Sequence, residues 1–328
     1  MRYKEANFQE NIGERIQCNL CPHHCLLEEG QHGICMVRKV VDNKLRSLVY
    51  GFPYAQHIDP IEKKPLYHFL PGSKSYSIGT QGCNLKCQFC QNWHLSTQFS
   101  HTDHYYSPGE IVERAIESGC SSISFTYNEP IVFAEYLMDI RDIAIERGLA
   151  SILVTNAYIT AKAREEVFKG INAVNIDLKA FDDKVYQDYT AARLEPVLDT
   201  IKWCIKNDIH TEISSLIIPG VNDDPDIFEK QCYWLLKNCG EDLAFHLNAF
   251  YPAYKMAHYP STSQAILKRC KKIAKNAGLK YVYIGNYPGF DNNTYCADCH
   301  EPIIERNGYD IYIKKNNEHR SPLVWSLK

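Results

Sequence analysis

Three cysteines lie close together in the segment GTQGCNLKCQFCQNWH, residues 79–94. Cys83, Cys87 and Cys90 have the spacing C-x3-C-x2-C, so their thiolates can surround one compact metal centre. A structural zinc ion normally takes four protein ligands in a closed tetrahedron, whereas three thiolates suit three corners of a 4Fe-4S cluster. The spacing therefore predicts a cluster whose fourth iron is open to a small molecule. The alternatives are a chance group of cysteines and a zinc knuckle with a ligand from elsewhere in the chain.

Short β-rich segments alternate with longer helical ones from about residue 74 to residue 290, and these elements must position the cysteine loop. The predicted strands are residues 75–80, 121–127, 151–156, 173–179, 210–218, 244–250 and 280–285. The predicted helices are residues 107–119, 131–148, 160–170, 195–207, 224–238 and 262–277. Such alternation implies parallel strands joined by right-handed helical crossovers. The Ile- and Val-rich strands fit a sheet that is covered on both faces.

These strands are too few for a complete eight-stranded barrel, so we expect an α/β fold with a partial (β/α)6-type TIM barrel. A doubly wound open sheet is the alternative. The active site of a barrel lies at the carboxyl ends of its strands. Because Cys83 follows directly on the first strand, the cysteine loop is placed for chemistry rather than for stapling a surface.

At this point the chain resembles a known family, the radical S-adenosylmethionine (SAM) enzymes. The resemblance covers roughly residues 74–290 and rests first on the C-x3-C-x2-C loop, with Phe89 before the last cysteine. In that family the open iron binds the amino and carboxylate groups of SAM. An electron from the cluster then cleaves the S–C5′ bond, and the resulting 5′-deoxyadenosyl radical takes a hydrogen atom from the substrate. The resemblance therefore implies a 4Fe-4S cluster on Cys83, Cys87 and Cys90, with SAM as cofactor.

The segment TYNEP, residues 126–130, stands where many relatives carry a Gly-Gly-Glu segment that binds the SAM amino group. Tyr127 and Asn128 replace the two glycines, and the resemblance implies an amino-group role for Asn128 and Glu129. Further matches lie at later strand ends. They are Thr155 and Asn156 near the ribose, Asp177 and Lys179 at the methionyl part, Ser214 on the fifth strand, and Asn286 toward the adenine or ribose. A lysine can pair with the SAM carboxylate, although a simple ion pair between Asp177 and Lys179 is the alternative.

The sixth predicted strand and its extension, FHLNAFYPAYKM, carry four candidates for the substrate pocket: His246, Asn248, Tyr251 and Tyr254. Side chains alternate along a strand, so about half of such a set points into the barrel. Core packing with satisfied hydrogen bonds is the alternative interpretation of these side chains.

A second group of cysteines precedes the barrel, with the spacing Cys18-x2-Cys21-x3-Cys25-x9-Cys35. Four thiolates within so short a segment predict a closed metal site, either a structural zinc or an auxiliary 4Fe-4S cluster. This site would be the second metal of the protein.

Cys296 and Cys299 form a third group that looks like half of a zinc ribbon. Cys18 and Cys21 could complete the ribbon across the barrel, but this would leave the other two N-terminal cysteines without a site. We favour one metal on the four N-terminal cysteines, with the C-terminal pair free or part of a separate site.

We divide the chain into a Cys-rich N-terminal module (1–70), the barrel (71–290) and a C-terminal CxxC and hairpin module (291–328). The text CNLCPHHC…GQHGIC, the QNWH after the cluster loop and TYNEP together resemble the radical SAM member of the AmmeMemoRadiSam group. This group belongs to the branch similar to pyruvate formate-lyase activating enzyme.

The composition excludes several other classes of protein. A net charge of −3 with no basic stripe gives no reason to expect nucleic-acid binding. No apolar run is long enough for a membrane span, and the charged N-terminus does not resemble a signal peptide. We therefore expect a cytoplasmic protein, in which the fourteen cysteines are better metal ligands than disulfide partners.

The sequence favours a radical SAM enzyme that acts on an unidentified small molecule or protein residue. A glycyl-radical-enzyme activase is the alternative, although many activases carry extra clusters just after the cysteine loop and this chain has no cysteine between Cys90 and Cys120. A non-catalytic metal-binding or nucleic-acid-binding protein is a third candidate. Reduction of a cluster implies a one-electron donor such as flavodoxin or ferredoxin.

Overall fold

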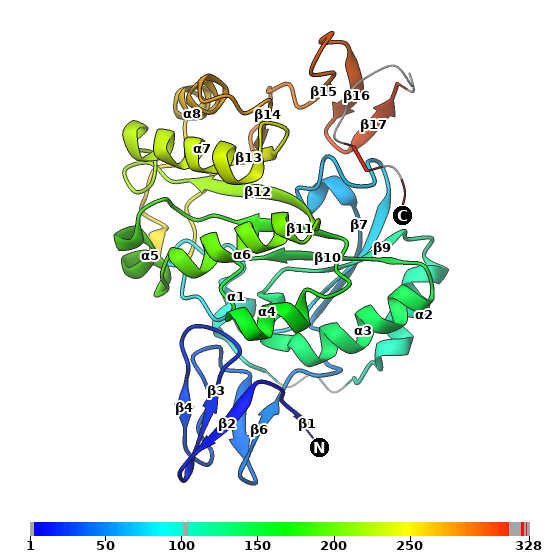
Figure 1. Ribbon diagram of the computed structural model, residues 1–328, viewed down its shortest axis with the longest axis vertical. Coiled ribbons are helices and arrows are strands. Elements are labelled where there is room, and N and C mark those ends of the chain that lie inside the picture. The colour runs from blue at the N-terminus through cyan, green and yellow to red at the C-terminus, as the bar shows by residue number, and fades with distance from the viewer. Residues whose placement is uncertain (1–2, 101–103, 315–322, 325, 327–328) are drawn as a thin grey trace.

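Figure 1 shows the protein as a computed structural model, which describes all residues except 1–2, 101–103, 315–322, 325 and 327–328. In the described part of the chain, eight strands form the main sheet in the order β14-β13-β12-β11-β10-β9-β8-β7. The strands are β7 (Ala55–Pro60), β8 (Lys74–Gly79), β9 (Ser122–Phe125), β10 (Ala150–Thr155), β11 (Ala173–Asp177), β12 (His210–Ile217), β13 (Ala244–Ala249) and β14 (Tyr281–Gly285). From β8 to β14 all neighbours pair in parallel, so the seven strands expected from the sequence are confirmed.

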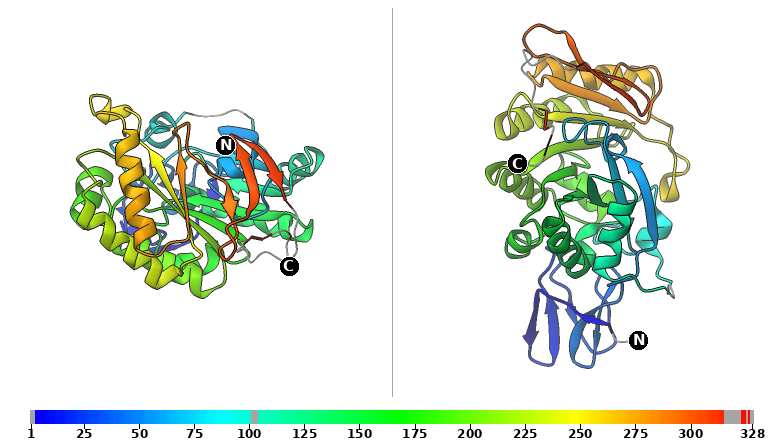
Figure 2. Two further views of the ribbon diagram at one scale, coloured as in Figure 1. Left: turned by 90° about the horizontal axis from the view of Figure 1, so that it is seen from above. Right: turned by 90° about the vertical axis from the view of Figure 1, so that its right-hand side faces the viewer.

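Six helices cover the outer face of this sheet (Figure 2): α2 (Pro108–Glu117), α3 (Ala134–Glu146), α4 (Ala161–Val167), α6 (Glu195–Lys206), α7 (Pro225–Cys239) and α8 (Gln264–Asn276). The shorter helices α1 (Trp93–Thr97) and α5 (Asp183–Thr190) lie instead beside the cysteine loop, where the Lys86 N–H donates to the Thr190 carbonyl. Local sequence explains several of their starts. Ser107 and Glu110 form a capping box at α2, and Asp224 accepts two backbone N–H bonds at the start of α7. The sequence missed α1 and α5, which are both short.

The main sheet is open, because its edge strands β14 and β7 do not pair with each other. This agrees with the expected α/β fold and partial barrel. The boundary placed at residue 70 differs from the structure, since β7 is part of the sheet and runs antiparallel to β8. After β7, a 3-10 helix, η1 (Ile61–Lys63), leads into a segment whose Tyr67 and His68 amides both donate to Glu212 on β12. This segment therefore lies against the interior of the barrel.

Two small sheets form the N-terminal module: β1 (Lys4–Glu5) with β6 (Lys44–Ser47) and β5 (Arg38–Val41), and β2 (Gln9–Ile12) with β3 (Arg15–Cys18) and β4 (Leu26–Leu27). The module lies at one end of the molecule (Figure 1). β15 (Thr294–Tyr295), β16 (Pro302–Asn307) and β17 (Asp310–Ile313) lie at the other end, as Figure 2 also shows. β5 and β6 form a hairpin that turns at Asp42-Asn43, and β16 and β17 form the hairpin of the C-terminal module, which turns at Asn307-Gly308.

This separation corrects one alternative from the sequence. Cys18 and Cys21 belong to the N-terminal module, whereas Cys296 and Cys299 belong to the C-terminal one. The two pairs lie at opposite ends of the molecule and cannot form one zinc ribbon (Figure 1). The positions of the two cysteine pairs in the sequence did not indicate how far apart the pairs lie in the folded protein. No helix in the described ranges combines the length and the apolar character that a membrane span requires.

Candidate active site at the carboxyl ends of the strands

The cysteine loop follows β8 and is held close to the N-terminal module. Gly82 has φ +83°, and a Cβ atom there would lie 2.4 Å from the carbonyl oxygen of Cys35. Only glycine fits this position without a shift of the backbone. Next to it, the Asn84 carbonyl makes a 2.8 Å hydrogen bond with Nε2 of His23. The N-terminal module therefore fixes one side of the loop.

Around the sulfur atoms, the protein supplies polar hydrogens. The Leu85 backbone N–H lies 3.4 Å from Sγ of Cys83, and Nδ2 of Asn156 lies 3.8 Å from the same sulfur. Sγ of Cys90 lies 3.3 Å from the Ser96 hydroxyl. Hydrogen bonds to cysteine sulfurs are among the features that tune the potential of an iron–sulfur cluster.

A cavity of about 480 Å³ opens beside this loop and collects most of the predicted site. The sequence-predicted residues that line it are Cys83, Cys87, Cys90, Asn128, Glu129, Asn156, Asp177, Lys179, Asn248 and Asn286. They come from the ends of β8, β9, β10, β11, β13 and β14 or from the loops that follow. Parallel strands bring their carboxyl ends to one edge, which is why residues so distant in sequence share one cavity.

Glu129 links two of these strand ends. Its carboxylate accepts hydrogen bonds from the Thr155 hydroxyl at 2.7 Å, the Asn156 N–H at 2.8 Å and the Ile131 N–H at 3.0 Å. Burial nevertheless raises the pKa of Glu129 to about 7. A buried carboxylate of this kind is stabilised in its ionised form by a nearby cation, so the site favours a cationic group of a ligand.

Asp177 and Lys179 form an ion pair at the end of β11, with 2.8 Å between Nζ and Oδ2. Burial opposes the charged form of Lys179, but the Asp177 carboxylate keeps the pKa of the ammonium above its usual range. The alternative of a strand-end ion pair is thus present, and both partners also line the cavity. A ligand carboxylate that enters the cavity would meet an ammonium that is already charged and held in place by Asp177.

Asn128, for which the resemblance implied a role at the SAM amino group, already has hydrogen-bond partners within the protein. Its Oδ1 accepts from the Thr80 N–H at 3.0 Å, and its Nδ2 donates to the Gly82 carbonyl at 2.9 Å. The side chain therefore braces the start of the cysteine loop, although it also lines the cavity. The preceding Tyr127 has φ +70°, a conformation that costs a non-glycine residue energy and is often found at functional sites.

Five of the residues predicted to contact SAM or the substrate do not line the cavity: Thr155, Ser214, His246, Tyr251 and Tyr254. Thr155 is buried behind it and supports Glu129, and the buried Ser214 hydroxyl has no hydrogen-bond partner in the described part of the structure. Tyr251 is partly exposed and donates to the Asn286 carbonyl, while Tyr254 stacks on Trp93 with 5.5 Å between ring centroids.

His246 is the clearest error. It points into the barrel, as alternation indicated, but its Nε2 lies 2.7 Å from Oε2 of Glu212, and its ring contacts Tyr67 and Tyr283. It is 2% exposed and belongs to a packed polar network rather than to the substrate cavity. Alternation predicts the side of the strand to which a residue points, but not its depth in the barrel.

The three cysteines fit a cluster in their donor chemistry. Burial raises the pKa of the Cys87 thiol to about 12 and that of Cys83 well above its usual range, so these thiols are protonated without a metal and must lose protons to iron. No group of three or more His, Cys, Asp or Glu side chains in the described ranges is arranged around a single ion. A cubane cluster does not require that arrangement, because each thiolate binds its own iron.

The four N-terminal cysteines lie near one another. Burial, and then the charges of Cys18, Cys35 and Cys25, raise the pKa of the Cys21 thiol. The Ile34 N–H lies 3.5 Å from Sγ of Cys25. Since the described side chains are not arranged around a single ion, the second metal stays a prediction.

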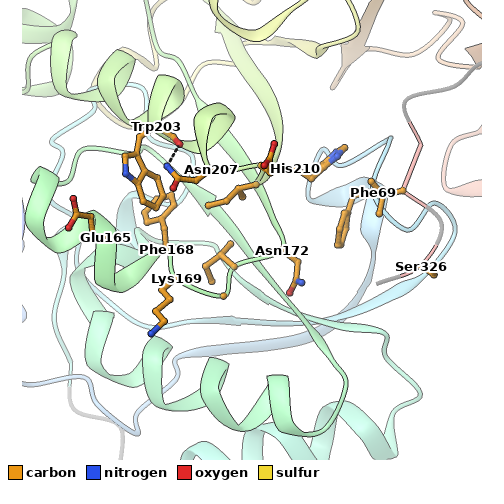
Figure 3. A pocket seen from close by; sticks show the side chains of 14 residues that line it. Phe69, Glu165, Phe168, Lys169, Asn172, Trp203, Asn207, His210 and Ser326 are labelled. Atoms are coloured by element: carbon orange, nitrogen blue, oxygen red, sulfur yellow. Dashed lines mark hydrogen bonds between the residues drawn. The ribbon is translucent and has the colours of Figure 1, made fainter. Parts of the chain in front are cut away.

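A second cavity, of about 530 Å³, lies at the opposite end of the barrel strands (Figure 3). Phe168 and Trp203 pack edge to face on one side, and Phe69 and His210 lie on the other. His210 begins β12, so this cavity is at the amino ends of the strands. None of the sequence-predicted site residues lines it.

The sequence missed two cationic residues of the active-site cavity, Lys63 and Lys64. They follow β7, which had been assigned to a separate module. It also missed Asn92, whose side chain donates to the Tyr127 carbonyl at 2.9 Å. The only signal was the position of Asn92 two residues after the last cysteine of the loop.

The comparisons with known proteins agree on the family. The model described as the radical SAM superfamily matches residues 77–230. "Uncharacterized protein MJ0808" of Methanocaldococcus jannaschii is 39% identical over 94% of this chain and 93% of its own length. Pyruvate formate-lyase 1-activating enzyme of Escherichia coli (strain K12) is 21% identical over 44% of this chain, which spans 62% of that enzyme.

A solved structure shares the fold. It is a radical SAM methyltransferase from Sphaerobacter thermophilus, with a TM-score of 0.53 and 16% identity over 67% of this chain and 68% of that chain. Its likeness supports the arrangement of the partial barrel.

Proposed function

The chain belongs to the radical SAM superfamily of enzymes, and from this premise we propose that it cleaves SAM reductively and transfers the radical to a substrate in the same cavity. The observation that supports this proposal is the shared lining of that cavity. It brings three cysteines together with Glu129 and Lys179, which come from three different strand ends. A cluster on the cysteines, when bound, supplies one electron to SAM.

Side chains of opposite charge would bind the two charged groups of SAM. Lys179 would pair with the SAM carboxylate, and Glu129 would accept from the SAM ammonium. Asn156 already donates to Cys83 and to Asn84, so it would hold the cluster loop against the cofactor. Asn286 follows β14 at the same edge and would face the nucleoside part.

The cavity volume lies in the range of small-molecule sites, and SAM would occupy part of it, so we favour a small molecule or a single extended side chain as substrate. A one-electron donor such as flavodoxin or ferredoxin would reduce the cluster. Zinc or an auxiliary 4Fe-4S cluster would occupy the four N-terminal cysteines.

A glycyl-radical-enzyme activase is the second candidate, supported by the similarity to the E. coli activating enzyme. In this case the protein substrate would have to present a glycine to the cavity. An EPR doublet after mixing with a glycyl radical enzyme is the result that would favour it.

Product analysis tests the proposal. The protein is reconstituted anaerobically with iron and sulfide, reduced, and given SAM, and 5′-deoxyadenosine is measured. We expect product from the wild type and none from Cys87→Ala. Cys239→Ala is the matched control, because Cys239 is also half-buried but lies at the end of α7, away from the cavity. Wild-type protein that forms no 5′-deoxyadenosine, or equal product from both variants, would overturn the proposal.

A further inference from the structure

Two lysines of the active-site cavity share one carboxylate. Nζ of Lys63 lies 2.8 Å from Oδ1 of Asp59, and Nζ of Lys64 lies 2.6 Å from Oδ2. The Tyr127 hydroxyl donates to the same Oδ2 at 2.6 Å. We call Asp59, Lys63 and Lys64 the lysine pair site. With both ammonium groups charged, this site holds one positive charge more than its carboxylate neutralises.

Asp59 and Lys64 are the rigidly held members of the lysine pair site. Asp59 is on β7, opposite Ser75 of β8, and the Lys64 backbone N–H closes η1 by donating to the Ile61 carbonyl. The ammonium of Lys64 also lies 4.8 Å from the centre of the Tyr127 ring. The Lys64 side chain is 2% exposed and the Asp59 side chain 5%. A site fixed in this way loses little conformational freedom when it binds a ligand.

Burial disfavours the charged forms of Asp59 and Lys64, but hydrogen bonds keep the Asp59 carboxylate ionised. Burial would raise the pKa of Asp59, yet the hydrogen bonds from Lys63, Lys64 and Tyr127 hold it well below its usual range. Burial lowers the pKa of Lys64. An additional anion beside the lysines would offset this desolvation.

The other charged groups of the cavity are engaged elsewhere. Lys179 is paired one to one with Asp177, and Glu129 is bound by the amides and hydroxyl that follow β9 and β10. These are the groups that the proposed function assigns to SAM. The lysine pair site comes from β7 and η1, at the edge of the sheet, and has no role in that assignment.

We propose that the lysine pair site binds an anionic group, a carboxylate or a phosphate, of the substrate. The substrate would occupy the part of the active-site cavity that Lys63 and Lys64 line. Lys63 is the adaptable member, because half of its side chain is exposed and its ammonium can turn from Asp59 toward the ligand. Lys64 and Tyr127 keep Asp59 in place when this happens. The identification of this ligand as the substrate rests on the proposed function, whereas the anion site itself does not.

Calorimetric titration of the purified chain, without cluster or SAM, tests the proposal with inorganic phosphate and with acetate as separate probes. Low ionic strength is required, since salt screens the interaction. We expect at least one probe to bind, and Lys63→Gln to weaken its binding by about tenfold, the typical value of one charge-assisted hydrogen bond. The tighter of the two probes identifies the chemistry of the group. Circular dichroism checks that each variant is folded.

Lys44→Gln is the matched control. Lys44 is 51% exposed and lies 2.7 Å from Glu5, much as Lys63 is 49% exposed and 2.8 Å from Asp59, but Lys44 belongs to the N-terminal module. We expect this variant to bind the probes like the wild type. Absence of binding by both probes, or equal binding by the wild type and Lys63→Gln, overturns the proposal. Because no cluster is present, neither result depends on SAM cleavage, and a protein that binds anions through Lys63 without cleaving SAM would contradict the proposed function alone.

Discussion

Replacing Glu135 with alanine should lower the free energy of unfolding by about 3–5 kcal/mol, because the change leaves a buried guanidinium without its partner. Glu135 on α3 accepts from Nη1 of Arg38 with both oxygens, at 2.9 and 3.0 Å, and from the Asn7 N–H at 2.7 Å. Arg38 is 1% exposed and Glu135 2%. This buried ion pair joins the N-terminal module to the barrel.

A double variant separates the cost of burying the two charged groups from the loss of their mutual attraction. Arg38→Met with Glu135→Leu removes both charges, and we expect it to be destabilised by less than about 1.5 kcal/mol, because the desolvation penalty disappears together with the attraction. Urea unfolding followed by circular dichroism gives the free energy and the m-value for each protein.

The exposed pair of Arg147 with Glu113 is the control. Its side chains are 44% and 50% exposed, and Glu113→Ala should leave the unfolding midpoint nearly unchanged. If Glu135→Ala unfolds within about 1 kcal/mol of the wild type, or if the double variant is no more stable than the single one, the unpaired Arg38 guanidinium is not costly to bury.

Three further predictions concern pH, the cysteine loop and SAM. Burial lowers the pKa of His68 from 6.5 to about 3, so the unfolded chain binds a proton between these values that the folded chain does not. Stability should therefore fall as the pH drops through this window, and His68→Gln should reduce the slope of unfolding free energy against pH by up to about 1.4 kcal/mol per unit. Gly82→Ala should lower the melting temperature and abolish SAM cleavage, whereas Gly109→Ala, where a Cβ meets nothing within 4 Å, should leave both intact. Lys179→Met should raise the dissociation constant of SAM about tenfold or more in equilibrium binding, while the exposed Lys184→Met should not change it.

The sequence predicted the parallel sheet and the cysteine loop because both depend on local patterns. Ile- and Val-rich runs between helical segments specify buried parallel strands, and the spacing of Cys83, Cys87 and Cys90 is itself the signal for a shared centre. The resemblance to the family singled out Asp177 and Lys179, and the structure places both in the lining of the cavity, where they form an ion pair with each other.

Strand β7, the two lysines of the cavity and the position of His246 could not be predicted, because they depend on tertiary structure. The segment AQHIDP has only one β-branched residue and ends in proline, so its composition does not indicate a strand, and it forms β7 as the antiparallel partner of β8 over its whole length. Lys63 and Lys64 look like surface residues in the sequence, and they reach the cavity because η1 follows directly on β7, which pairs with β8. His246 was misplaced for the opposite reason, because its strand was correct but its depth in the barrel was unknown.

The EPR spectrum of the reduced, reconstituted protein reports on the cluster and on SAM at the same centre. We expect the signal of a reduced 4Fe-4S cluster that changes when SAM is added, and we expect this SAM-sensitive signal to be absent from Cys87→Ala. If no signal responds to SAM, or if a SAM-sensitive signal persists in Cys87→Ala, SAM does not bind at a cluster held by the cysteine loop.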